Sequence, residues 1–319
     1  MGKTNRILAW ILSGTLSLGT AGAAKACAFH GYTPNPTLID ILLATEQVVI
    51  ARPAPSDPNR YMPLETLAGP DVQDIPIRMT PTTRALLNGK PSSTVLLARD
   101  GSYGPWLEIA ILDETYRAFV SQVLHRQSEL LLGGDKKRFR LFAELLNDQN
   151  PDIRRLALQE LDRAPYGALK SLRLPRVQNL RQDLETGDED LMPIRVLLAG
   201  LSKDRSLTPY LSSELDAAIQ REVPYMGAYA TAMIELEGRA AVQDILDRHL
   251  KADGLSATTR ERLLQALAIQ YKTASGSTRR AIARGVADLL RTSPELGDIA
   301  ARQFGFQSRS GLAELQPDR

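Results

Sequence analysis

Residues 145–161 read LLNDQNPDIRRLALQEL, and this stretch decides the fold of the larger part of the chain. Apolar side chains on both sides of its centre recur at helical spacing. They are Phe139, Phe142, Leu145, Leu146, Ile153, Leu156, Ala157 and Leu161. Asn150 is placed to cap a second helix, with Pro151 at that helix's first position. The stretch therefore predicts two helices, 136–147 and 151–162, joined by a tight polar turn.

The same cycle of apolar helix and polar turn recurs from residue 115 to residue 305. Further helices are predicted at 191–201, 211–220, 225–237, 240–250, 258–273 and 278–291. Helix pairs with short connections are the repeating unit of an α-solenoid. The same pattern also fits an irregular helical bundle, which is the alternative arrangement.

The opening stretch resembles a HEAT-type repeat. In such repeats an apolar first helix meets a polar turn with Asp or Asn and often Pro, and an aliphatic–Arg pair opens the second helix. Here Asn150-Pro151 forms the turn and Ile153-Arg154 is the pair. The resemblance covers residues 135–292 and is clearest in its first unit. It implies a stack of helix pairs in which Arg154 ties adjacent repeats together.

The N-terminal part of the chain is richer in Pro, Gly and Thr. Strands are predicted at 47–51, 61–67, 74–79, 94–99 and 106–112, with a helix at 36–46 capped by Asn35 and a loop at 53–58. Pro76 confines the third strand to an edge or a bulge. The expected fold class is therefore α+β, with a small N-terminal antiparallel β-domain followed by a larger all-α, HEAT-like helical repeat domain.

Residues 37–112 also resemble, more faintly, the netrin-type, OB-like barrels that follow signal peptides. The matching pieces are Cys27, the strand Val48-Val49-Ile50-Ala51 and the turn Gly104-Pro105-Trp106. The disulfides of that family are absent, because the chain has one Cys. This departure puts the barrel itself in doubt.

These patterns divide the chain into five segments. We expect a signal peptide at 1–28, a small β-rich domain at 29–113, a connecting helix and hinge at 114–134, a helical repeat domain at 135–305 and a flexible tail at 306–319.

The first 28 residues have the order of a secretory signal. Lys3 and Arg6 precede an apolar run, and small residues cluster at 21–28. Cleavage after Ala23, Ala26 or Ala28 satisfies the small-x-small rule. The expected location is therefore periplasmic or secreted.

Two alternatives to a cleaved signal involve the membrane. A spanning helix needs about 20 mostly apolar residues, and here the run is broken by Ser13, Gly14 and Thr15. A lipid anchor could attach at Cys27, but Lys25 stands where lipoprotein signals carry a small uncharged residue. No transmembrane segment is expected after the signal.

Charge argues against a nucleic-acid partner. The full chain has 39 Lys and Arg, 37 Asp and Glu, and a formal charge of +2. Lys3, Arg6 and Lys25 are the charged residues before Phe29. Without them the net charge is −1, so the basic surplus belongs to the signal. General attraction to polyanions is not expected.

Cys27 and His30 form the one soft-ligand pair in the sequence, and they are the candidate metal ligands. A metal site needs three or four ligands, and cleavage after Ala28 would remove Cys27. His125 and His249 fit a solvated helix face and a helix end. No resident cofactor is expected.

No catalytic motif is present, since the nucleophile elbow, the phosphate-binding loop and the dinucleotide fingerprint are all missing. The first hypothesis is a non-enzymatic interaction or scaffold protein that binds a protein or peptide, with Tyr32, Tyr103 and Trp106 as candidate contact residues. The alternatives are a hydrolase with dispersed catalytic residues and a metal carrier using Cys27 and His30.

Overall fold

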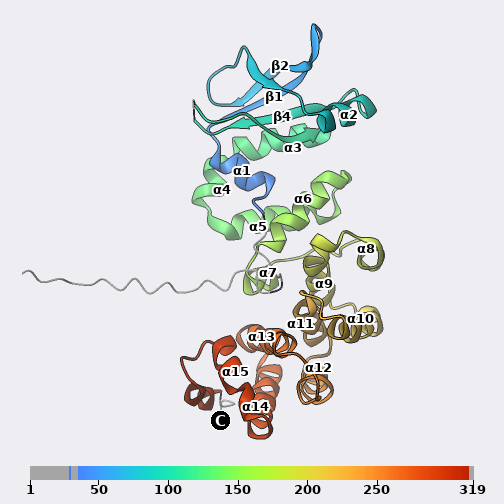
Figure 1. Cartoon of the computed structure of the whole chain (residues 1–319), viewed down its shortest axis with the longest axis vertical. Coiled ribbons are helices and arrows are strands. Elements are labelled where there is room, and N and C mark those ends of the chain that lie inside the picture. The colour runs from blue at the N-terminus through green and yellow to red at the C-terminus, as the bar shows by residue number, and fades with distance from the viewer. Residues whose placement is uncertain (1–28, 30–34, 102, 316–319) are drawn as a thin grey trace, which may run out of the picture.

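The computed structural model describes residues 29, 35–101 and 103–315. The molecule is elongated, with a β-sheet at one end and the last helices at the other (Figure 1). Within the described ranges, every helix is too short or too polar to cross a membrane. The predicted α+β layout, a small antiparallel sheet followed by helices, is confirmed.

The sheet has five antiparallel strands in the order β3-β2-β1-β4-β5. They are β1 (Gln47–Ala54), β2 (Asp57–Ala68), β3 (Ile75–Arg78), β4 (Thr94–Arg99) and β5 (Leu107–Leu112). The prediction that Pro76 confines its strand to an edge is confirmed, because β3 pairs on one side with β2. The strand predicted at 94–99 has the bounds of β4.

Both faces of the sheet are covered, which explains the unbroken apolar run of its central strand. Val48 and Ile50 of β1 belong to the main hydrophobic core, together with side chains of α1 (Leu38–Ala44) and α3 (Glu114–His125). Val49 and Ala51 point to the other face, which is packed by Leu87 of α2 (Pro81–Gly89). Residues alternate between the faces of a strand, so the part of β1 that is covered on both sides, residues 48–51, must be apolar throughout.

Two local predictions in this part are wrong, and one helix was not predicted. The loop expected at 53–58 is a hairpin, because Ala54 pairs with Asp57. The helix expected from residue 36 is capped by Thr37 rather than Asn35: the Thr37 hydroxyl accepts from the Asp40 N–H, and the Asp40 carboxylate accepts from the Thr37 N–H. Helix α2 lies where no helix is expected, since its few apolar side chains give a weak periodic pattern.

Helices make up the rest of the chain. They are α3, α4 (Gln127–Leu132), α5 (Gly134–Glu144), α6 (Pro151–Asp162), α7 (Tyr166–Ser171), α8 (Leu180–Thr186), α9 (Met192–Leu201), α10 (Thr208–Gln220), α11 (Met226–Glu237), α12 (Arg239–Asp244), α13 (Ala257–Thr273), α14 (Gly276–Thr292) and α15 (Gly297–Phe304). Helix α12 continues as a π-helical segment, Ile245–Leu250. Short 3-10 segments lie at Leu145–Asn147, Glu189–Leu191, Arg205–Leu207, Pro294–Leu296 and Arg309–Glu314.

The helix start predicted at Asn150-Pro151 is confirmed. The Asn150 side-chain oxygen accepts from the backbone N–H groups of Asp152, at 2.8 Å, and Ile153. Arg154, however, donates to the carbonyls of Asp148 and Gln149 in its own turn. None of its hydrogen bonds to described residues reaches a neighbouring helix pair, so the tie implied by the resemblance is not made.

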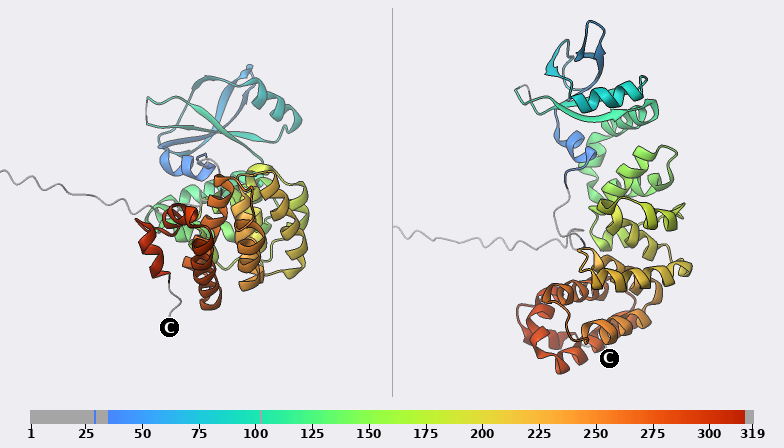
Figure 2. Two further views of the ribbon diagram at one scale, coloured as in Figure 1. Left: turned by 60° about the horizontal axis from the view of Figure 1, so that its bottom comes forward. Right: turned by 45° about the vertical axis from the view of Figure 1, so that its right-hand side comes forward.

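Alternate helices form one continuous layer. Helix α6 contacts α9, α9 contacts α11, α11 contacts α13, and α13 contacts α15. A second set lies beside this layer, with α5 against α6, α8 against α9, α10 against α11 and α14 against α13 (Figure 2). Each helix pair therefore rests mainly on its neighbours, and the core extends along the length of the array.

The sheet and the helices share this core. Arg138 of α5 donates to Asp40 of α1 at 2.8 Å and to Glu160 of α6 at 2.6 Å. Phe29 is buried between α7 and α11, where its ring meets Tyr166 edge-on. At the other end, Leu312 and Leu315 are buried in the same core.

Candidate functional site

The residues singled out from the sequence lie around one turn of the sheet or outside the described residues. Tyr103 lies in the turn between β4 and β5 and is fully exposed. Trp106 is buried in the second core, with the Arg99 guanidinium 4.7 Å above its ring. Tyr32, Cys27 and His30 lie outside the described residues. Within 35–101 and 103–315, together with Phe29, no three metal-binding side chains are grouped.

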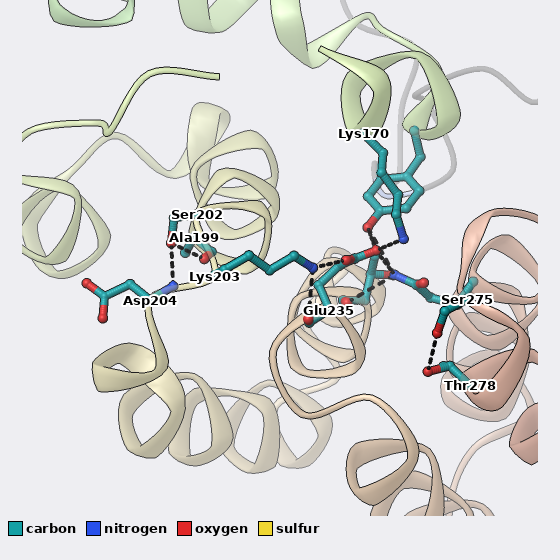
Figure 3. A network of polar contacts seen from close by, with 11 residues as sticks. Lys170, Ala199, Ser202, Lys203, Asp204, Glu235, Ser275 and Thr278 are labelled. Carbon is teal, nitrogen blue, oxygen red and sulfur yellow. Dashed lines mark hydrogen bonds and ion pairs between the residues drawn. The ribbon is translucent and has the colours of Figure 1, made fainter. Parts of the chain in front are cut away.

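The most connected polar cluster centres on Glu235 of α11 (Figure 3). Lys170 of α7 and Lys203, at the end of α9, point toward its carboxylate from two sides, the second at 2.5 Å. The Tyr166 hydroxyl donates to the same carboxylate at 2.6 Å. The Gln270 amide of α13 donates to the carboxylate and to the Tyr166 hydroxyl, each at 3.0 Å. Four parts of the helical array are thus joined at one side chain.

Glu235 is ionised in this setting. Burial would raise its pKa, but hydrogen bonds from Lys170, Lys203, Tyr166 and Gln270 overcome this effect and hold the pKa at about 2. Burial and the charge of Glu235 raise the pKa of Tyr166 well above its usual value. A carboxylate with this pKa keeps no proton near neutral pH and is a weak base. The Glu235 cluster is therefore suited to holding helices together rather than to proton transfer.

Two surface depressions lie beside α9. The two depressions, of about 1050 and 420 Å³, share the lining residues Val177, Gln178, Asn179, Leu180 and Leu198. Both therefore border one connecting segment, residues 172–179, between α7 and α8. We call the two depressions together the 172–180 groove.

Two hydrogen bonds from the side chain of Asn147 hold the connecting segment. The Asn147 amide donates to the Arg176 carbonyl, and its oxygen accepts from the Gln178 N–H, both at 2.9 Å. Asn179 then turns the chain into α8 with a φ of 55°, a left-handed conformation that Asn tolerates better than most residues. The segment is therefore held in place although it belongs to no helix or strand.

Three arginines line the smaller depression. Arg195 of α9 is 9% exposed and donates to the Asp188 carbonyl at 2.7 Å. Arg154 donates only to backbone carbonyls of the described residues. Arg155 is ion-paired with Asp188 at the surface. A buried charge has thus been placed beside an open depression.

Sequence patterns contain a signal for these residues. Arg195 is the one charged residue of α9, and Glu235 follows the mostly apolar run 226–234 of α11; both helices are buried over most of their length. A charged side chain in such a helix needs partners from elsewhere in the chain. The partners Lys170 and Gln270 carry no such mark, so the cluster itself is not visible in the sequence.

Comparisons of the chain with protein-family models, with curated proteins and with solved structures gave no match. Its function therefore has to be inferred from the geometry of these sites.

Proposed function

We propose that this chain is an exported, non-enzymatic interaction protein that binds an extended peptide of a partner protein in the 172–180 groove. The observation that carries the proposal is that two neighbouring depressions share residues 177–180 as part of their walls. Grooves of this kind in helical arrays serve as binding surfaces for other proteins.

Unused backbone groups favour an extended peptide as the occupant. Within the described part of the chain, the N–H groups of Leu174, Arg176 and Val177 make no hydrogen bond. A second extended chain could pair with such groups as an added strand, while pockets beside them take its side chains. The half-buried side chains of Leu174 and Val177 supply apolar contact.

The succession of helix pairs supports this role. Because α6, α9, α11 and α13 pack in sequence, the groove is carried by a layer that is anchored on both sides. The HEAT-like resemblance and a periplasmic or secreted location are part of the proposal. A rigid exported surface would bind its partner with little loss of conformational entropy.

The test is selection of displayed random peptides on the chain from Phe29 onward. Gln178 is exposed and lines both depressions, so Gln178→Trp should fill the groove without disturbing the core. Gln182→Trp makes the same change on an exposed position of α8 outside both linings and is the matched control. We expect peptides that bind the unmodified chain and Gln182→Trp with similar Kd and bind Gln178→Trp at least 10-fold more weakly, about 1.4 kcal/mol. Peptides that bind all three equally, or no enrichment at all, would contradict the proposal.

A further inference from the structure

Arg195 is a buried cation without an internal counter-ion. No described carboxylate forms an ion pair with it, and its Nε makes no hydrogen bond to the described residues. Its single hydrogen bond goes to a neutral group, the Asp188 carbonyl. A buried guanidinium is expected to be compensated by a carboxylate or several acceptors, so Arg195 retains unused binding capacity.

The position of the guanidinium is set by packing. Gly187, the residue that follows α8, lies directly against it: a Cβ at residue 187 would stand 2.6 Å from Nη1 and 2.7 Å from Cζ of Arg195. A side chain at 187 would therefore displace the guanidinium. The group is held against the backbone at the smaller depression rather than free to turn into solvent.

Neighbouring charges limit what could bind there. Arg154, Arg155 and Arg195 line the smaller depression together with Asp148, Asp152 and Asp183. Burial lowers the pKa of Arg195, Asp183 offsets part of this effect, and Arg155 adds to it. Because the cations and anions of the lining balance, a polyanion would meet repulsion. Among the described residues, Arg154 and Arg195 both lack a carboxylate partner, and Arg195 is the one that is buried and has an Nε without a hydrogen bond.

We propose that the 172–180 groove selects peptides that carry an Asp or Glu side chain, and that Arg195 binds this carboxylate. The inference rests on the proposed peptide-binding function. A planar guanidinium can bind both oxygens of a carboxylate at once, and such bonds are about twice as strong as neutral ones. Bound there, the peptide carboxylate would supply the negative charge that the fold does not place beside Arg195.

The test uses the tightest peptide from the display selection. Each acidic residue is replaced in turn by its amide, Asp by Asn or Glu by Gln, and Kd is measured by fluorescence anisotropy. With the unmodified chain, we expect one replacement to weaken binding on the order of 10- to 100-fold. With Arg195→Gln, acid and amide peptides should bind equally. Arg173→Gln, which changes an exposed arginine of the same segment outside both linings, should keep the full preference.

The possible results separate the two proposals. If peptides bind in the groove but every acid-to-amide change is silent, or if only the peptide's C-terminal carboxylate matters, the role of Arg195 is wrong and the peptide groove stands. If no peptide depends on the groove, the proposed function itself fails.

Should Arg195→Gln not fold, Arg195→Lys replaces it, since lysine keeps the charge without the planar fork. A reduced acid preference then supports the proposal, and an unchanged preference overturns it.

Discussion

Glu235 and Arg195 lie on neighbouring helices, and they differ in whether the chain supplies them with ion-pair partners. Each is a charged residue in a mostly buried helix. Glu235 is neutralised inside the chain by Lys170 and Lys203, whereas Arg195 meets a carbonyl and an open depression. A buried charge with a complete set of partners stabilises the arrangement of its helices. A buried charge whose partners are incomplete lowers stability and leaves a site where a ligand can bind.

The largest effect is expected where the internal pairing is broken. Glu235→Gln leaves Lys170 and Lys203 without a counter-charge, and we expect the free energy of unfolding to fall by about 3 kcal/mol in urea titrations. Glu237→Gln, two residues along the same helix, is the control and should cost less than about 1 kcal/mol. A Glu235→Gln protein within 1 kcal/mol of the unmodified chain would show that the Glu235 cluster is not a stabilising cross-link.

Lowering the pH should gradually remove the stabilisation that ionised Glu235 gives the folded chain. The pKa of Glu235 is lowered from an ordinary value of 4.5 to about 2 in the folded chain. Its stabilisation is therefore complete above pH 4.5 and is lost as the pH falls toward 2, by up to about 3 kcal/mol. Urea titrations at several pH values measure it as the stability difference between the unmodified chain and Glu235→Gln. A difference that stays constant between pH 5 and about pH 2.5 would contradict the lowered pKa.

The smallest effect is expected at the incompletely paired charge. Arg195→Met removes a buried charge and keeps the side-chain volume, so relief of desolvation should offset the lost hydrogen bond to Asp188. We expect the free energy of unfolding to change by less than about 1 kcal/mol. Arg138→Met, at an arginine paired with Asp40 and Glu160, is the matched comparison and should cost about 3 kcal/mol. Equal losses for the two variants would remove the distinction between complete and incomplete pairing.

Elements with strong local signals were predictable from the sequence. The helix at 151–162 and the strand at 94–99 have the bounds found in the structure. Asn150 before Pro151 fixes a helix start through its own side chain, and β4 is an unbroken apolar run before a turn. Helices α7, α8 and α15 were not predicted, because short helices carry few periodic positions.

The candidate site residues were harder to predict from the sequence than the helices and strands. Tyr103 is exposed and Trp106 is buried, yet both are aromatic residues beside the same turn. Which of the two packs depends on the side of the sheet that α2 covers, and α2 itself is weakly encoded. Exposure of a single aromatic residue is a tertiary property that neither its type nor its neighbours in sequence determine.

The sequence by itself determined the order of elements, an antiparallel sheet and then helices, because hydrophobic periodicity and caps act over a few residues. Tertiary structure alone decided which charges are paired. Tyr166, Glu235 and Gln270 are far apart in the chain but contact one another in the folded protein. Arg195 lies beside the smaller depression, which residues 177–180 also line. These contacts depend on how the helices stack, and a stack is fixed by the joint burial of apolar faces, which no single segment encodes.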